Sequence, residues 1–411
     1  MISEGEQLHA LRELGIELSR VQDLDMLMEK ILSEARRFVN ADAGSIYIRD
    51  GDVLYFSYTQ NDTLQQRLDK NEKLIYSNFT LPINTKSIAG YVASTGMVLN
   101  IEDAYGIPST ASYHFDPNFD DKCLYRTGSM LTLPLKTAKN EILGILQVIN
   151  AKDDARNNIP FSIHTEEIML HFASIASVAL ERAQMTRALL LRMIRMAEMR
   201  DPKETGAHVN RVGGYAVEIY EQWAKKRGIP KERIDKDRDI LRMAAMLHDV
   251  GKVGISDLIL KKPGRFTDEE FEIMKQHTLF GAQLFDNRKS DFDDAAAEVA
   301  LNHHERWDGK GYPGYITGLT DMPLGENLYL GKSSIGKAGE DIPLYGRIVA
   351  LADVYDALSS ARVYKNAWDE EDVLDTISRE SGRHFDPELV EIFFSILDIL
   401  RSIQKRFQDK T

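Results

Sequence analysis

The first 40 residues have the hydrophobic spacing of two amphipathic helices. Apolar residues recur every three or four positions within 4–20 and again within 23–39, which predicts a helix over each range. Asp23 stands where the N-cap of the second helix is expected. The pattern then changes, because 45–49 and 53–58 are short, rich in aromatic and β-branched residues, and separated by Asp-Gly-Asp. This change predicts a β-hairpin.

A second pair of predicted strands, 130–136 and 141–150, flanks a turn around Asn140. Between the two hairpins, the sequence predicts a helix over 87–94 and a loop-like stretch over 105–121 with two prolines. Helices outside an antiparallel sheet indicate an α+β domain.

This part of the chain resembles a GAF domain over residues 21–183. The resemblance rests on SMLTLPL at 129–135, ILGILQVIN at 142–150 and the helix and turn IAGYVASTG at 88–96. It implies a sensory domain that either binds a small molecule or only dimerises. Both alternatives stay open, because a core pattern does not identify the occupant of a pocket.

Residues 164–199 contain neither proline nor glycine, which predicts a long helix. Within this range, nine positions spaced alternately four and three residues apart form one stripe, and seven of them are apolar. The positions are 168, 172, 175, 179, 182, 186, 189, 193 and 196. We expect 184–200 to link the two domains and to pack against a second copy in a homodimer. The alternative, favoured by Arg182 and Thr186 in this stripe, is two ordinary helices that each pack within their own domain.

The second half of the chain carries histidines and carboxylates at helix ends and on apolar helix faces. His248-Asp249 and His303-His304 follow apolar helical runs, and Asp353 lies within an almost wholly apolar helix. A carboxylate there is costly to bury without a cation. Three further candidates are Glu204 and His208, which share a face if their turn is helical, and His277, which follows a capping box at 267–270.

Each of these side chains has an ordinary alternative as a cap, a surface pair or a packed core histidine. Together they are five histidines and three acids on five predicted helices, and helical bundles build metal sites from such facing side chains. Eight nitrogen and oxygen ligands are too many for one tetrahedral zinc, so two or three divalent ions are predicted. Imidazole and carboxylate without sulfur favour iron or manganese. Such clusters hold phosphate oxygens and stabilise both oxygens of an in-line displacement.

Residues 186–400 resemble the HD-GYP branch of the HD phosphohydrolases, with an all-α bundle placed at 201–400. The motifs are HD at 248–249, HHERWDG at 303–309, GYP at 311–313, ETGAH at 204–208, ADVYDAL at 352–358 and HFDPELV at 384–390. The resemblance implies a cyclic di-GMP phosphodiesterase that yields linear pGpG or GMP. Open alternatives are a slow or non-catalytic cyclic di-GMP-binding or docking module and an HD hydrolase of another nucleotide.

The same resemblance implies a role for each site residue. The implied metal ligands are Glu204, His208, His248, Asp249, His277, His303, His304 and Asp353, with Asp249 bridging and Glu204 serving a third ion. Lys252 is implied to contact the scissile phosphate or to protonate the leaving oxygen. Arg362 and Lys365 are implied to contact substrate phosphates. Tyr312 and Pro313 are implied either to contact substrate, to shape their loop, or to form a docking surface for a diguanylate cyclase.

Composition and charge limit the remaining possibilities. A net charge of −13 argues against a broad nucleic-acid surface. Cys123 is the sole cysteine, which excludes a disulfide within the chain and a thiolate metal cage. No apolar run suggests a membrane span and the N-terminus does not resemble a signal peptide, so a cytoplasmic location is expected. The stretch 319–334 is an insertion relative to the resembled family, either a lid or an inert loop.

Overall fold

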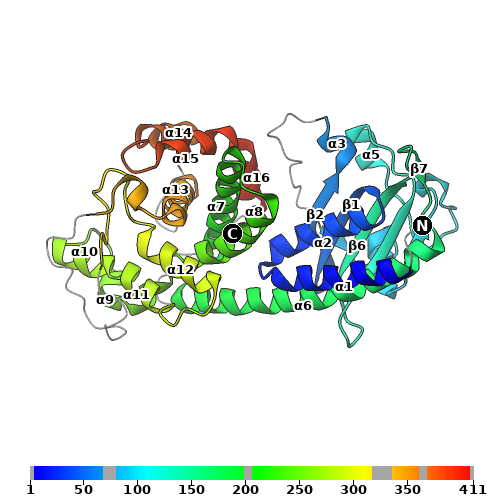
Figure 1. Ribbon diagram of the computed structural model, residues 1–411, viewed down its shortest axis with the longest axis horizontal. Helices are drawn as coiled ribbons and strands as arrows, with labels where there is room; N and C mark the ends of the chain where they lie inside the picture. Colours follow the sequence, from blue (N-terminus) through cyan, green and yellow to red (C-terminus); the bar gives the residue numbers. More distant parts are fainter. Residues whose placement is uncertain (1–3, 68–79, 199–205, 317–335, 361–367, 408–411) are drawn as a thin grey trace. The chain divides into compact units, whose positions relative to one another are not determined.

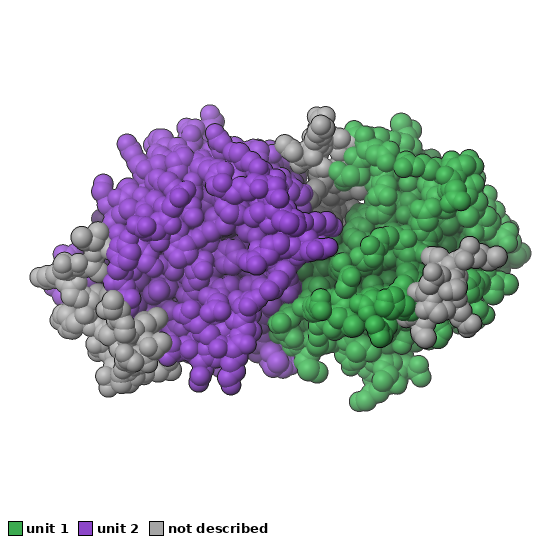
Figure 2. Space-filling view, in the orientation of Figure 1, with its two compact units in different colours: residues 1–187 green, residues 188–411 purple. Residues whose placement is uncertain are grey.

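The computed structural model describes residues 4–67, 80–198, 206–316, 336–360 and 368–407. The chain forms two compact units, Met1–Arg187 and Ala188–Thr411 (Figure 2). Glu204, Arg362, Lys365 and the 319–334 insertion lie outside the described residues.

Unit 1 is an α+β domain built on one antiparallel sheet, which confirms the predicted fold class. Within the described residues, the strand order is β3-β2-β1-β6-β5-β4, and β7 pairs with β6. Figure 1 labels β1, β2, β6 and β7 of this sheet. The strands are β1 (Ala41–Asp50), β2 (Val53–Asn61), β3 (Thr80–Pro82), β4 (Leu99–Ile101), β5 (Met130–Lys136), β6 (Ile142–Lys152) and β7 (Asn158–Ile159). The predicted hairpins are β1-β2 and β5-β6, joined through the β1-β6 pair at the centre of the sheet.

Helices cover both faces of this sheet. One face packs against α1 (Glu4–Arg20), α2 (Leu24–Phe38) and the first half of α6 (Ile163–Glu198), and its core includes Leu27, Leu131, Val148 and Phe172. The other face packs against α4 (Ile88–Thr95) through Val92. Short helices α3 (Asp62–Gln65), η1 (Ala104–Gly106) and α5 (Asn118–Cys123) lie in the connections, including the stretch expected to be a loop.

Local sequence signals explain where these elements begin and turn. The Asp23 carboxylate accepts hydrogen bonds from the backbone N–H groups of Asp25 and Met26, at 2.9 and 3.0 Å, and so caps α2 as predicted. Asn140, in the β5-β6 turn, has a φ of 63°, a value that asparagine tolerates better than most residues.

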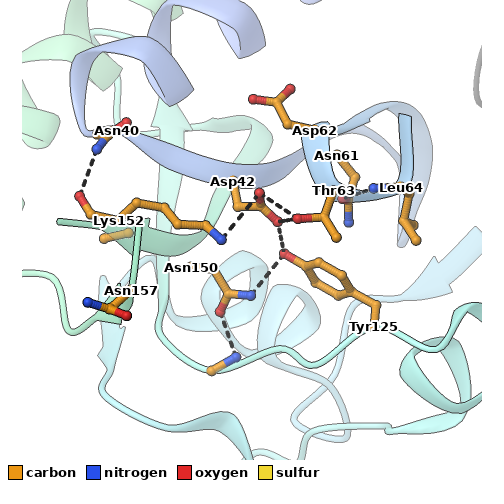
Figure 3. Close-up of polar contacts among 12 residues, drawn as sticks. Asn40, Asp42, Asn61, Asp62, Thr63, Leu64, Tyr125, Asn150, Lys152 and Asn157 are labelled. Carbon is orange, nitrogen blue, oxygen red and sulfur yellow. Dashed lines mark hydrogen bonds and ion pairs between the residues drawn. The ribbon is translucent and has the colours of Figure 1, made fainter. Parts of the chain in front are cut away.

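A partly buried polar network anchors the segment after α5 to the sheet (Figure 3). The Asp42 carboxylate on β1 accepts hydrogen bonds from the hydroxyls of Thr63 and Tyr125, each at 2.8 Å. Asn150 on β6 donates to the Tyr125 hydroxyl at 2.9 Å and accepts from the N–H of Gly128 at 2.7 Å. Since buried polar groups need partners, this network fixes the path of residues 125–128 across the strand ends.

Helix α6 is continuous from Ile163 to Glu198, in line with the predicted long helix. Phe172 and Ala179, two positions of the predicted dimer stripe, are buried in the core of unit 1. Leu189 and Met196, further along the same stripe, are 53% and 63% exposed. Packing within unit 1 therefore uses part of the stripe, and the homodimer stays a prediction.

Unit 2 is a helical bundle, as predicted for the C-terminal domain. Its elements are α7 (Gly206–Lys226), α8 (Lys231–Met246), η2 (Val250–Gly254), α9 (Asp257–Leu260), α10 (Asp268–Lys275), α11 (His277–Gln283), α12 (Asp291–Asn302), η4 (Gly339–Asp341), α13 (Leu344–Ser359), α14 (Glu370–Arg379), α15 (Pro387–Ser395) and α16 (Leu397–Arg406). The core between α7, α8, α12 and α13 includes Val212, Leu241, Val299 and Ile348, all fully buried. None of the described helices is both long enough and apolar enough to cross a membrane.

The segment that follows the predicted capping box forms two helices. Thr267 and Glu270 form both hydrogen bonds of that box and open α10, which ends at Lys275. Gln276 separates it from α11, whose first residue is His277. His277 therefore lies at the beginning of a helix, and its side chain is 1% exposed.

Candidate metal centre

Seven of the eight proposed ligands lie in two adjoining groups in unit 2. In the first, ligand atoms of His208, His248 and Asp353 all lie within 4.8 Å of one another. In the second, the same limit holds for Asp249, His277, His303 and His304. The eighth, Glu204, is outside the described residues. The side chains come from the start of α7, the turn after α8, the start of α11, the end of α12 and the middle of α13.

Asp249 faces both groups. Its Oδ1 lies 3.2 Å from Nε2 of His277 and 3.5 Å from Nε2 of His303. Its Oδ2 lies 3.2 Å from Nε2 of His248, in the first group. Nε2 of His248 is in turn 3.9 Å from Oδ1 of Asp353. One carboxylate thus presents one oxygen to each group, which is the arrangement of a ligand shared by two ions.

A close backbone contact brings Asp249 and His277 together. A Cβ on Gly251 would lie 1.9 Å from the carbonyl oxygen of His277 and 2.3 Å from the backbone nitrogen of Gly281. Only a residue without a side chain lets η2 approach α11 this closely. The glycine two residues after Asp249 is therefore part of the geometry of the site.

Each of four imidazoles is oriented by a hydrogen bond at Nδ1. In His248, Nδ1 lies 2.8 Å from the carbonyl oxygen of Ala245. In His277, Nδ1 lies 2.7 Å from the carbonyl oxygen of Met274. In His303 it lies 3.1 Å from two backbone carbonyls of α12. Because a carbonyl oxygen can only accept, Nδ1 must carry the proton in these three rings. Nε2 of each ring lies 3.2 to 3.5 Å from an oxygen of the Asp249 carboxylate, so Nε2 is the nitrogen left for a metal ion.

The fourth ring, His208, is oriented by a carboxylate. Its Nδ1 lies 2.8 Å from Oδ2 of Asp356, one turn beyond Asp353 on α13. Arg211, one turn beyond His208 on α7, donates to the same carboxylate from Nε at 2.6 Å and from Nη2 at 2.9 Å. Burial alone would raise the pKa of Asp356, but the hydrogen bonds from His208 and Arg211 lower it below its usual value. An ionised Asp356 therefore fixes the tautomer that leaves Nε2 of His208 available.

The donor set fits divalent cations. The Nε2 atoms of His277 and His303 are buried and have no hydrogen-bond partner among the described residues. Burial lowers the pKa of His303 more than the nearby Asp249 carboxylate raises it. Burial and the neighbouring rings of His303 and His277 lower the pKa of His304 well below its usual value. A divalent cation would satisfy these buried ring nitrogens and the Asp249 carboxylate together.

The proposed catalytic and loop residues border the same cluster. Nζ of Lys252 lies 2.8 Å from Oδ2 of Asp249. The Tyr312 ring stacks on His304, with centroids 4.8 Å apart, and burial raises the pKa of Tyr312. Pro313 is buried, whereas Lys252, His304 and Asp353 are half-buried. These half-buried side chains form the accessible side of the cluster.

Three family models match this chain. A GAF domain model matches residues 23–180, and an HD domain model matches residues 205–358. A second HD domain model matches residues 332–389. The chain carries a GAF domain followed by an HD domain. All seven clustered side chains lie within the match of the first HD model.

The curated relatives align over about half of this chain. A protein of Vibrio cholerae named "Cyclic di-GMP phosphodiesterase" is 42% identical over 219 residues, 52% of this chain and 40% of that protein. A second V. cholerae protein, "3'3'-cGAMP-specific phosphodiesterase 2", is 34% identical over 60% of this chain and 41% of its own length. A "Cyclic di-GMP phosphodiesterase" of Thermotoga maritima is 38% identical over 52% of this chain and 50% of its length. The chain thus spans half or less of the length of these relatives.

The HD domain contains two site residues that sequence reasoning missed, Arg211 and Asp356. Asp356 lies three residues after Asp353, so it can reach the cluster side of α13 from the next turn, and this spacing is a usable signal. Arg211 has the same spacing from His208, but its partner Asp356 is 145 positions away, so local spacing does not reveal that pairing.

Proposed function

We propose that this protein is a metal-dependent phosphodiesterase that hydrolyses cyclic di-GMP to pGpG, to GMP, or to both, under the control of its GAF domain. The observation that carries the proposal is the pair of histidine–carboxylate groups joined by Asp249. Two relatives named cyclic di-GMP phosphodiesterases, 42% and 38% identical, support the choice of substrate.

The proposed ligands of two ions are the two groups described above. His208, His248 and Asp353 would hold one ion, and His277, His303 and His304 the other, with Asp249 shared between them. Glu204 would serve a third ion. The absence of sulfur from this donor set favours iron or manganese. When bound, such ions lower the pKa of water and neutralise charge on phosphate oxygens.

The protein's own residues would supply orientation and a proton. Hydrolysis breaks the bond between phosphorus and one ribose oxygen and forms a bond from phosphorus to a water oxygen. The departing alkoxide needs a proton, and the Lys252 ammonium, held 2.8 Å from Asp249 at the edge of the cluster, can donate it. Arg362, Lys365, Tyr312 and Pro313 complete the proposed substrate contacts, the first two through phosphate charge.

A second candidate substrate is 3'3'-cGAMP, which the name of the relative 34% identical to this chain supports. Hydrolysis of the phosphodiester is the same reaction for both dinucleotides, so only contacts to the bases can make the protein prefer one substrate. A third possibility is a module that binds a cyclic dinucleotide or docks a cyclase with slow turnover or none. A substrate panel with one metal loading separates the two substrates, and binding without product identifies the third case.

The proposal extends to partners of the chain. A small molecule bound by the GAF domain would regulate turnover, and the loop at 311–313 would dock a diguanylate cyclase. A homodimer would form through α6, where Leu189, Met193 and Met196 are 53%, 42% and 63% exposed. The expected cytoplasmic location also stays a prediction.

The central test is hydrolysis by protein purified without oxygen and analysed for metal content. We expect the wild type to contain about two ions per chain and to convert cyclic di-GMP to linear products. His248→Ala should lose both bound metal and turnover. His171→Ala is the control, because His171 is an exposed histidine of α6 outside the cluster. Unchanged turnover in His248→Ala would refute the assignment.

A further inference from the structure

An aromatic surface adjoins the metal cluster on the side of α10. Phe271 on α10 contacts Tyr312 nearly edge-on, with ring centroids 6.0 Å apart and planes at 82°. Nζ of Lys275, one turn later on α10, lies 4.9 Å from the centroid of Phe271 and 5.6 Å from that of Tyr312. We call these three residues the aromatic shelf.

The shelf is continuous with the candidate ligands. Tyr312 stacks on His304 at 4.8 Å and meets His277 nearly edge-on at 6.4 Å. Phe271 is therefore two ring contacts away from the cluster. A molecule whose phosphodiester lay at the cluster would have its neighbouring groups within reach of Phe271.

Exposure and charge distinguish this surface from ordinary packing. Phe271 is 42% exposed, although it lies beside the half-buried Tyr312. The Lys275 ammonium pairs with Glu272 at 2.6 Å. An ammonium carries three donors, so one such pair does not use its full hydrogen-bonding capacity. An accessible aromatic ring with a cation beside it can stack a flat heterocycle and donate to its edge.

Resting on the proposed function, we propose that the shelf binds one guanine of the cyclic dinucleotide. Phe271 stacks on the base, and Lys275 donates to the acceptors O6 and N7 of guanine. Adenine presents an amino donor where guanine presents O6, so Lys275 favours guanine over adenine. Stacking alone tolerates either base. Phe271 thus contributes affinity for dinucleotides in general, and Lys275 contributes the choice of base.

The test compares three substrates with the metal-loaded full chain: cyclic di-GMP, cyclic di-AMP and methyl 4-nitrophenyl phosphate, which has no base. Phe271→Ala should raise KM for cyclic di-GMP roughly tenfold, which is in the range that loss of one stacked base produces. It should leave turnover of methyl 4-nitrophenyl phosphate unchanged. Phe271→Tyr should restore the wild-type KM.

Lys275→Met should reduce the ratio of kcat/KM for cyclic di-GMP over cyclic di-AMP roughly tenfold, the discrimination typical of one good base contact. Phe394→Ala is the matched control, because Phe394 on α15 is a phenylalanine of similar exposure, 38%, in the same unit. Phe394→Ala should leave KM and kcat unchanged for all three substrates.

An unchanged KM in Phe271→Ala would overturn the shelf, as would an equal loss on all three substrates. A wild type that cleaves methyl 4-nitrophenyl phosphate but neither dinucleotide would instead refute the proposed function. In that case, calorimetry of GMP and AMP binding to wild type and Phe271→Ala would test base binding by the shelf independently of turnover. Roughly tenfold weaker GMP binding in the variant supports it, and equal binding refutes it.

Discussion

Nδ1 of His208 lies 2.8 Å from Oδ2 of Asp356, and this pair joins α7 to α13 beside the cluster. Asp353 and Asp356, on successive turns of α13, contact opposite nitrogens of the same ring, since Nε2 of His208 lies 3.6 Å from Oδ1 of Asp353. One helix therefore supplies both a candidate ligand and the group that orients another.

Asp356→Asn should weaken metal binding without removing any proposed ligand. The amide carries no charge, so it holds the His208 N–H and the Arg211 guanidinium more weakly than the carboxylate does. Loss of such an orienting partner typically costs 10- to 100-fold in metal affinity, and we expect a change of roughly that size. Competition with a chromogenic chelator measures it. Asp372→Asn, an exposed acid of α14, is the control, and equal affinities in the two variants would contradict this role.

Lys252→Ala should reduce kcat for cyclic di-GMP by about 10²- to 10⁴-fold, the usual contribution of a proton donor. The ion content should stay near that of wild type, because Lys252 is not among the proposed ligands. Bis(4-nitrophenyl) phosphate has a leaving group that needs no proton, so its hydrolysis should fall far less. Lys261→Ala, which changes an exposed lysine of the same region, serves as the reference. An equal loss on both substrates would argue for a role in binding or structure.

Gly251→Ala should destabilise unit 2 and reduce its metal content. The added methyl group would overlap the backbone of α11, which cannot move without carrying His277 away from Asp249. Forced overpacking typically costs about 1–3 kcal/mol, and rigid backbone neighbours place this case at the upper end. Urea unfolding and metal analysis report the two effects. Gly206→Ala is the matched change, since a Cβ there meets no atom of the described residues within 4 Å, and it should leave both quantities near wild type.

His384 should make the stability of unit 2 fall in weak acid. Burial, with help from nearby Arg306, lowers the pKa of His384 from 6.5 to about 4. Between these values the unfolded chain takes up a proton that the folded chain does not, so the free energy of unfolding decreases as pH falls from about 6.5 to about 4. The loss from this group is at most roughly 3 kcal/mol.

Urea unfolding of chelated protein at several pH values tests this dependence. His384→Asn should flatten the curve of unfolding free energy against pH over that window. His171→Asn, which changes an exposed histidine of α6, should follow the wild-type curve. Parallel curves for His384→Asn and wild type would show that His384 does not cause the loss.

Much of the fold follows from local sequence patterns. The alternation of strand residues and the Asp-Gly-Asp turn predicted the first hairpin, and Asp23 predicted the start of α2. The short strands β3, β4 and β7 were not predicted. They contain two or three residues each, too few to show a period, and pairing with longer neighbours defines them.

The sequence predicted the candidate ligands, but not the contacts that orient them. Histidines and acids on apolar helices signalled a cluster, because such groups are costly to bury without a partner. The break at Gln276, which makes His277 a helix start, has no glycine or proline to mark it. The pair of Arg211 and Asp356 depends on how α7 packs against α13, and no local pattern encodes that contact.

The position of Asp249 links the two groups of candidate ligands. Its two oxygens face different groups, and the one near His248 is also 2.8 Å from the Lys252 ammonium. The first ion to arrive would set the carboxylate's orientation for the second, so loading should be cooperative. Loss of Asp249 would therefore disturb both groups and the position of the Lys252 ammonium together.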